Sequence, residues 1–385
     1  MNNSNQQSAI RYHYMDNLRA LAMLMGIFFH AALAYSPITH FVWLTAEKEK
    51  SVSLDVIAWF THLFRMPLFF LIAGFFALYL IEKRGLPRFL KNRGLRVLLP
   101  LLIFLPLVLW SIKAGIEWAL VHVDNPSLLL QFIGLAKNNP DAPKPPFSMG
   151  HLWFLYNLAM FYVVFVVLWK LRFFDSVWVK KMMSRSFILL ILPVLVIPAF
   201  FSQAAPHPAP EGIMPQWWSF AFYGVLFIVG ACIYKHQAIL EDLQRFKYVL
   251  LILSLLAYAY LYGLFPAMLS IGSSWYHFKV AALEAFIAVY MTVCCLSFGA
   301  QLLNQANGVF RYFADASYWI YIIHIPLLFL IQYQLMDVEW FSWIEFLIAS
   351  CLTIAIGLIT YALLVRRTPI GLLLNGKMIR KKQMD

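Results

Sequence analysis

Apolar stretches of about twenty residues recur along this chain, separated by segments that carry most of the charge. An α-helix needs a stretch of that length to cross the hydrocarbon core of a bilayer, which is about 30 Å thick. The 385 residues are 62% hydrophobic and 12% charged, a composition outside the range of ordinary soluble domains. Polar and apolar residues do not alternate within the stretches, which excludes a transmembrane β-barrel. The sequence therefore predicts an all-α polytopic membrane protein, with the lipid bilayer as its first partner.

We expect about ten transmembrane helices in a single membrane domain that spans 1–385, with 366–385 as a basic cytoplasmic tail. The predicted helices are 18–36, 56–81, 97–120, 151–170, 187–201, 218–234, 248–266, 280–298, 317–334 and 343–365. Alternate connections, together with the two terminal segments, carry 23 of the 30 Lys and Arg residues. Because positive residues are enriched in cytoplasmic loops, both termini are predicted to be cytoplasmic. The formal net charge of +12 is thus a topology signal, and no nucleic-acid partner is expected.

The first predicted helix carries ionisable residues at its start and deep inside. Arg19 and His30 are eleven residues apart, or three turns plus roughly 20°, so both side chains share one face about 16 Å apart along the axis. If the helix enters the hydrocarbon near Leu18, His30 lies about 18 Å deep, near the midplane. Asp16 is expected to orient Arg19 or to contact a substrate. A polar stripe of this kind suits a ligand path, but a histidine bonded to a carbonyl and an arginine reaching the headgroups would explain it equally well.

Three more arginines stand out in the next two helices. Arg65 is expected about 14 Å from the outer surface, in a helix whose Pro67 and Gly74 favour a kink and a close approach of backbones. Arg93 and Arg96 are three residues apart and point the same way at the start of the third helix. They form either a clamp for phosphates or an anchor of the positive-inside kind.

Two histidines and a glutamate in later helices have open roles as possible substrate-binding residues. His324, about 10 Å inside its helix, either orients a substrate or packs with a bond to a carbonyl. Glu284, one turn inside, binds a sugar, pairs with Lys279 or Arg65, or is solvated at the interface. His151 starts its helix either as an interfacial residue or as part of an acceptor entrance. No zinc-type ligand spacing occurs, so no metal site is expected.

Five short motifs in order resemble the membrane acyltransferase 3 family. They are Arg19 and His30 with ten residues between them, FFLIAGFF at 69–76, RGLRVLLPLL at 93–102, HLWFL at 151–155 and YWIYIIHIP at 318–326. The resemblance runs from Asp16 to about Arg366. It implies that the first helix is retained, although its apolar run before Ala-Leu-Ala is similar to a cleavable signal peptide. One departure is Ala73, where the family usually has Ser.

The resemblance implies a multi-pass inner-membrane O-acyltransferase that moves an acyl group from cytoplasmic acyl-CoA, a donor substrate rather than a bound cofactor, to a hydroxyl of an extracytoplasmic glycan. It implies that Arg19, Arg93 and Arg96 meet the phosphates. His30 would be a general base or an acyl carrier, and Arg65 would stabilise the oxyanion or hold a succinyl carboxylate. FRMPLFF at 64–70 and HLWFL are most similar to the glucan biosynthesis protein C group, which implies succinyl transfer to a periplasmic glucan.

An alternative of another class is a proton-coupled transporter or flippase. In that interpretation His30, Arg65, Glu284 and His324 form a relay for protons, since ionisable residues inside a membrane commonly do. The pair Arg93 and Arg96 distinguishes the two interpretations, because a site for acyl-CoA requires such cations and a proton relay does not.

Overall fold

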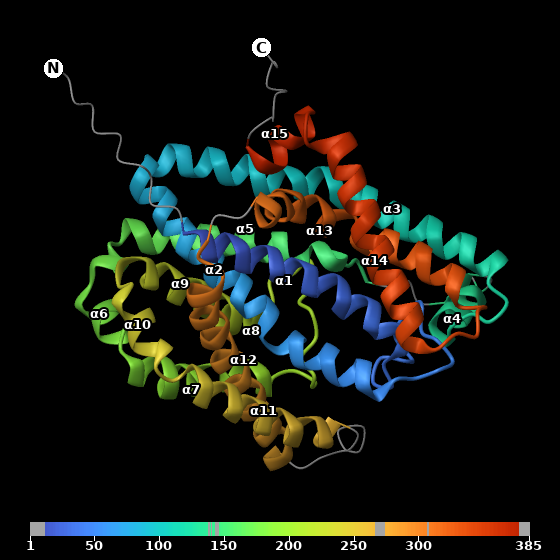
Figure 1. The fold of residues 1–385 in the computed structure, drawn as a ribbon, viewed down its shortest axis with the longest axis horizontal. Helices are drawn as coiled ribbons and strands as arrows, with labels where there is room; N and C mark the ends of the chain where they lie inside the picture. Colours follow the sequence, from blue (N-terminus) through green and yellow to red (C-terminus); the bar gives the residue numbers. More distant parts are fainter. Residues whose placement is uncertain are drawn as a thin grey trace.

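The computed structural model describes residues 12–137, 139, 141–142, 146–265, 274–305 and 308–376. These residues are mostly helical and contain no β-strand, and the bridge between Ser148 and Gly212 is the one strand-like pairing among them. The helices pack side by side into one bundle (Figure 1). The predicted all-α class is therefore confirmed.

Several helices are continued by a short 3₁₀ or π-helical turn, labelled η. The elements are α1 His13–Ala32, η1 Leu33–Tyr35, α2 Val52–Arg93, η2 Gly94–Leu98, α3 Leu99–His122, α4 Leu128–Lys137, η3 Gly150–Leu152, α5 Trp153–Lys170, η4 Phe173–Asp175, α6 Val177–Met182, η5 Phe187–Ile191, α7 Leu192–Phe201, α8 Trp217–Ser219, η6 Phe220–Gly224, α9 Val225–Lys235, α10 Ala238–Gln244, α11 Lys247–Leu264, α12 Ser274–Leu302, α13 Gly308–Leu335, α14 Ser342–Thr360, η8 Tyr361–Val365 and α15 Pro369–Asn375. Each of the ten predicted ranges lies mainly on one or more of these elements.

Eight helical runs in the described part of the chain are long and apolar enough to cross a membrane. One of them, Val52–His122, contains both the second and the third predicted helix. The fifth predicted helix corresponds to the shorter apolar run Phe187–Phe201. The multi-pass class is thus confirmed, whereas the number of crossings and the side of the termini stay predictions.

Two predicted connections are more helical than expected. Residues 82–96 were expected to connect two separate helices, but α2 continues to Arg93 and joins α3 through η2. The direction changes at Gly85, whose φ of +74° is a conformation that glycine adopts without steric cost, and Pro87 follows two residues later. The connection 121–150 contains α4. Charged residues did not prevent helix formation here, because they lie where their side chains are exposed to solvent.

Helix α1 lies at the centre of the bundle, where it packs against α2, α12, α13 and α14 (Figure 1). Helix α2 in turn packs along α9, and the two backbones approach closely at two glycines. A Cβ atom added to Gly74 would lie 1.8 Å from the carbonyl oxygen of Phe227, and one added to Gly230 would lie 1.9 Å from that of Leu71. The predicted role of Gly74 in a close backbone approach is confirmed.

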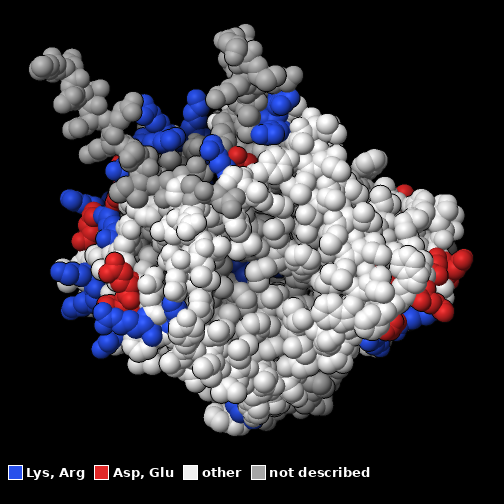
Figure 2. Space-filling view, in the orientation of Figure 1, with Lys and Arg blue, Asp and Glu red and all other residues white. Residues whose placement is uncertain are grey.

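Charged side chains gather at opposite ends of the face shown in Figure 2. Lys and Arg, with some acidic residues, occupy the left and upper edges, while Asp and Glu predominate at the right edge, beyond α4 in the view of Figure 1. A broad surface between them is almost free of charge. That distribution fits a protein whose middle lies in hydrocarbon and whose ends are exposed to water.

Candidate functional site

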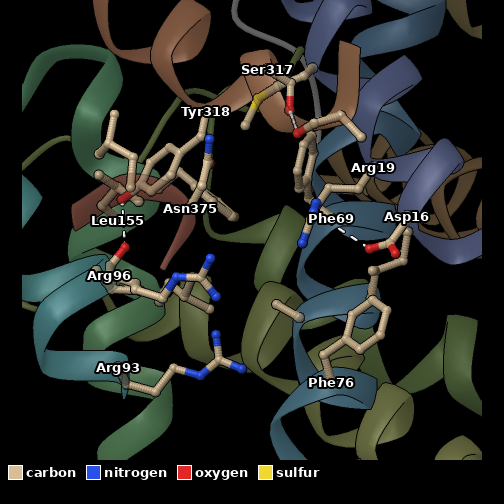
Figure 3. Close-up of a pocket in the computed structure, with 18 of the residues that line it drawn as sticks. Asp16, Arg19, Phe69, Phe76, Arg93, Arg96, Leu155, Ser317, Tyr318 and Asn375 are labelled. Atoms are coloured by element: carbon tan, nitrogen blue, oxygen red, sulfur yellow. Dashed lines mark hydrogen bonds and ion pairs between the residues drawn. The ribbon is translucent and has the colours of Figure 1, made fainter. Parts of the chain in front are cut away.

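A cavity of about 300 Å³, here called the arginine cavity, lies beside the first half of α1, which contains Arg19. Figure 3 shows Arg93 and Arg96 projecting into it from one wall, and Asp16 and Arg19 from the opposite wall. The walls come from α1, α2, η2, α5, α13 and α15. The structure thus brings together the three arginines that the family resemblance links to phosphates.

Each arginine is held in a way that leaves part of its guanidinium available. Arg19 Nη2 is 3.5 Å from Asp16 Oδ1, which confirms the predicted pairing, yet the Arg19 side chain keeps 42% of its exposure. The Arg93 guanidinium carbon lies 5.0 Å from the ring centroid of Tyr162, and its buried Nε has no hydrogen-bond partner. The Tyr318 hydroxyl donates to the main-chain oxygen of Arg96 at 2.7 Å, which fixes the turn that carries this side chain. Such groups are well suited to bidentate contacts with an anion.

The remaining lining of the arginine cavity is largely apolar. Phe69, Ile72 and Phe76 contribute one face of α2, and Ala73 lies among them. A Ser at position 73 would have added a hydroxyl here; the methyl group of Ala73 cannot hydrogen-bond to a ligand. The lining carries three arginines against two aspartates, so its net charge is positive, and it is complementary to a ligand that is anionic in one part and uncharged in another.

A second group of polar side chains surrounds His30 farther along α1. The rings of His30 and His324 lie 5.3 Å apart between centroids, and His30 stacks on Trp43 at 5.9 Å with the planes 10° apart. The Arg65 guanidinium lies 4.7 Å from the ring of Phe29, and its Nη1 would be 3.0 Å from a Cβ atom at Gly26, one turn before His30. The structure therefore confirms that Arg65 and His30 reach the same level of the bundle.

Several nitrogens of this group are buried without a hydrogen-bond partner: His30 Nδ1, Arg65 Nε and Nη1, and His324 Nε2. An unsatisfied buried polar group costs about 1–3 kcal/mol, so a set of them in one place indicates that another molecule completes the site. The imidazoles supply lone pairs that can accept protons, and the guanidinium supplies a fixed positive charge. This arrangement can remove a proton and stabilise a negative charge.

Both later histidines are anchored to backbone carbonyls, as one interpretation of His324 allowed. His324 Nδ1 is 2.6 Å from the oxygen of Tyr321, and His151 Nε2 is 3.0 Å from that of Ile322. Since a carbonyl only accepts, these nitrogens carry the protons, which leaves His324 Nε2 and His151 Nδ1 as buried acceptors. The two rings lie 4.8 Å apart between centroids. His151 is buried, and its place at the membrane interface or in an acceptor entrance stays a prediction.

Glu284 has a partner that the sequence did not indicate. Its Oε1 accepts from the backbone N–H of His207 at 3.2 Å and lies 3.4 Å from His207 Nδ1. The predicted pairing with Lys279 or Arg65 was wrong, as was solvation, because Glu284 is buried. Burial lowers the pKa of His207 to about 3, so this imidazole is neutral at physiological pH. His62 Nε2 donates to the oxygen of His207 at 2.9 Å, which ties α2 to the connection between α7 and α8.

His62, His207 and Trp43 are the members of the site that sequence reasoning missed. His62 precedes Arg65 by three residues, so the helical period could have found it. His207 and Trp43 lie on connections between helices, where no periodicity relates them to the site. Within the described residues, no group of three or more His, Cys, Asp or Glu side chains is placed to hold a metal ion.

The chain is similar in sequence to known proteins. A family model described as an acyltransferase domain matches residues 12–362. Relatives named glucans biosynthesis protein C are similar over nearly the whole chain. The protein of Escherichia coli O139:H28 is 26% identical and that of Escherichia coli K12 is 27% identical, each over 99% of this chain and 98% of the relative. No solved structure matches this chain.

Proposed function

The chain belongs to the membrane acyltransferase 3 family and is an acyltransferase, and we propose that it moves an acyl group from cytoplasmic acyl-CoA to a hydroxyl of an extracytoplasmic glycan. In this proposal it resides in the plasma membrane, the inner membrane of a two-membrane cell. The arginine cavity receives the phosphates of the donor, and His30 receives the acceptor hydroxyl.

One observation carries the proposal: a single helix, α1, presents Arg19 in the arginine cavity and His30 in the polar group beyond it. The eleven residues between them correspond to about 16 Å of helix. A donor whose phosphates lie beside Arg19, Arg93 and Arg96 can therefore extend its uncharged arm past Phe69 toward His30. The anionic phosphates of acyl-CoA match the arginines of the cavity, and its uncharged arm, which contains amide groups, matches walls that are apolar with a few polar side chains.

The chemical step requires a base and a group that stabilises an oxyanion. A neutral His30 accepts the proton of the acceptor hydroxyl while the oxygen attacks the thioester carbonyl. Arg65 stabilises the negative charge that develops on the carbonyl oxygen. The carbon–sulfur bond then breaks, and the proton held by His30 passes to the departing thiolate, which leaves as CoA. In a two-step variant, His30 carries the acyl group before the hydroxyl attacks.

The acyl group and the acceptor are proposed from the relatives. Proteins named glucans biosynthesis protein C suggest a glucan as the acceptor. Succinyl is the preferred acyl group in this proposal, with acetyl second, because the resemblance to the glucan biosynthesis protein C group implies succinyl transfer. For a succinyl group, Arg65 has the alternative role of holding the distal carboxylate instead of the oxyanion. The family membership sets aside the transporter interpretation, and the arginine cavity gives the cations that a proton relay does not need.

The test uses purified protein in liposomes with radiolabelled succinyl-CoA or acetyl-CoA and a neutral glucan. His30→Ala is compared with wild type and with His122→Ala, an exposed histidine whose Nδ1 bonds within its own helix to Trp118 O. We expect label on the glucan and release of CoA in wild type and in His122→Ala. Loss of both in a folded His30→Ala protein supports the proposal, and unchanged transfer in that variant refutes the mechanism.

A further inference from the structure

A second cavity, of about 400 Å³, lies at the acidic end of the molecule, away from the arginine cavity. Its walls come from the connection between η1 and α2, from Asn125, and from the residues that join α13 to α14. Glu47, Asp337, Glu345 and Trp340 line it, and we call it the carboxylate pocket. Its size falls in the range of about 300–1,000 Å³ that is typical of small-molecule sites.

Hydrogen bonds hold most of the polar groups of this pocket in place. Asp337 accepts from the backbone N–H groups of Asp124 and Asn125, at 3.0 and 2.8 Å, and from the Asn125 side chain at 3.1 Å. Glu345 accepts from the backbone N–H of Trp340 at 3.2 Å. Because these carboxylates are fixed by hydrogen bonds from the backbone, the pocket is a preformed feature of the fold.

Glu47 differs from the other acids of the pocket. Only 6% of the residue is exposed, and its Oε1 is buried without a hydrogen-bond partner. Burial, together with the charges of Glu345 and Asp337, raises the pKa of Glu47 to about 8. The group is therefore mostly protonated at neutral pH and can both donate and accept a hydrogen bond. A ligand that offers hydroxyl groups would satisfy it.

The aromatic and acidic side chains of the pocket fit an uncharged carbohydrate. The Trp340 residue is 50% exposed, so its ring offers a flat surface on which the apolar face of a sugar can lie. Carboxylates and the Asn125 amide match the hydroxyls at the edge of a sugar ring. Lys48, the one basic residue in the lining, already bonds to Asn125. An anionic ligand would meet several like charges, which disfavours it.

The carboxylate pocket is connected to His30 by the chain itself. The backbone N–H of Glu47 donates to the oxygen of Ala34 at 2.8 Å, and Ala34 lies four residues, or about 6 Å of helix rise, beyond His30. Trp43, on the same connection, stacks on His30. Gln332 of α13 bonds to both Thr45 and the oxygen of Ala31, at 2.7 and 3.0 Å. The connection that carries Glu47 in the pocket wall is therefore also the one that contacts His30.

From this geometry we propose that the carboxylate pocket binds an uncharged oligosaccharide, namely the part of the glycan acceptor next to the sugar that is acylated. Trp340 stacks on a sugar ring, and Glu47 hydrogen-bonds to its hydroxyls. This inference rests on the proposed function for its role in catalysis, whereas binding of the oligosaccharide does not require the acyl donor.

The first experiment measures binding without any donor. Cellotetraose and the corresponding tetraglucuronate are titrated into wild type, Trp340→Ala and Glu47→Gln in lipid nanodiscs by calorimetry. Trp217→Ala serves as the control, because Trp217 is 81% exposed and lies outside the carboxylate pocket. We expect cellotetraose to bind wild type and the control equally and to bind Trp340→Ala at least tenfold more weakly. Equal binding to all four proteins, no binding to wild type, or binding of tetraglucuronate as tight as that of cellotetraose overturns the inference.

A second experiment separates the pocket from the proposed chemistry. In the acyl-transfer assay we expect Trp340→Ala to raise the KM for the glucan at least tenfold with the KM for the acyl donor unchanged. Glu47→Gln, which keeps one donor and one acceptor in place of the protonated acid, should change the KM for the glucan less than Trp340→Ala does. A change in the donor KM alone contradicts an acceptor site. If wild type transfers no acyl group, the proposed function fails, and the binding titrations still decide whether the carboxylate pocket takes a sugar.

Discussion

The contact between α2 and α9 allows a quantitative prediction, because no side chain can move to relieve a substitution there. An alanine Cβ at position 74 would lie 1.8 Å from the oxygen and 2.7 Å from the carbon of the Phe227 carbonyl. An alanine at position 230 would meet the Leu71 backbone at 1.9 to 2.9 Å. Real Cβ atoms essentially never come within 3.0 Å of another heavy atom, so the two helices must separate by about 1 Å.

The cost follows from the packing that such a separation removes. A gap of about 0.5–1 Å forfeits a quarter to a half of each atom pair's attraction of about 0.1–0.2 kcal/mol. If roughly forty pairs are affected, the number that one buried leucine makes, the loss is about 1–4 kcal/mol. This agrees with about 1–3 kcal/mol for overpacked cores. We therefore expect Gly74→Ala and Gly230→Ala each to destabilise the protein by about 3 kcal/mol.

The assay heats purified protein in detergent and measures the fraction that stays monodisperse on size exclusion. Gly263→Ala is the matched control: Gly263 lies in α11, and a Cβ there has no heavy atom within 4 Å. Alanine favours a helix by about 1 kcal/mol over glycine, so the control should be at least as stable as wild type. The double variant should cost less than the sum of the two single ones, because one separation relieves both clashes. Melting midpoints for Gly74→Ala and Gly230→Ala equal to that of Gly263→Ala would refute the reasoning.

Three further predictions concern charged groups. Arg96→Ala removes one charge-assisted contact of about 1.5–3 kcal/mol, so the KM for acyl-CoA should rise at least tenfold while the KM for the glucan stays constant. Arg88 is exposed and lies outside the arginine cavity, and an equal effect of Arg88→Ala in the same kinetics would contradict this prediction. Arg65→Lys keeps the charge but loses the planar fork, so kcat should fall more than either KM changes, and a lysine variant with full kcat would argue against a role at the oxyanion. The pKa of Glu47 is raised from 4.5 to about 8, so the folded protein holds the proton of this carboxyl more tightly than the unfolded chain does. The stability that this proton contributes is fully present below about pH 4.5 and is lost as the pH rises through 8. At about 1.4 kcal/mol per unit the loss approaches 5 kcal/mol, so Glu47→Gln should melt higher than wild type at pH 9 and the advantage should vanish at pH 5; a constant difference between the two would contradict the buried acid.

Local periodicity explains which parts of this site could be read from the sequence. The side chains of Arg93 and Arg96 lie three residues apart, and Arg19 shares a face of α1 with His30, so helical geometry alone directs them. The predicted ranges lie on helices because apolar runs of membrane length leave the backbone no other way to satisfy its hydrogen bonds. The change of helix direction at Gly85 was not predicted, because it depends on a positive φ within a polar stretch whose sequence is typical of a loop.

The contacts that could not be predicted are those between segments far apart in the chain. Glu284 and His207 are 77 residues apart, and nothing in the Pro-rich sequence around His207 indicates that it turns inward. Likewise Gln332 reaches Thr45 across 287 residues. Such contacts depend on how the helices pack, which is set by many small side-chain fits such as those at Gly74 rather than by a local pattern.

The two ends of the site have opposite charge, and this gives transfer a direction. In the proposed mechanism the arginine cavity attracts an anionic donor at one end, while the carboxylate pocket admits an uncharged acceptor at the other. Succinyl transfer would place a negative charge on the sugar next to the one held in the pocket with Asp337 and Glu345. A glycan that binds well before the reaction is repelled after it, since like charges at short range disfavour the complex. The repulsion promotes release of the product and disfavours the reverse reaction, and it follows from the same acidic residues that make the pocket suitable for a neutral sugar.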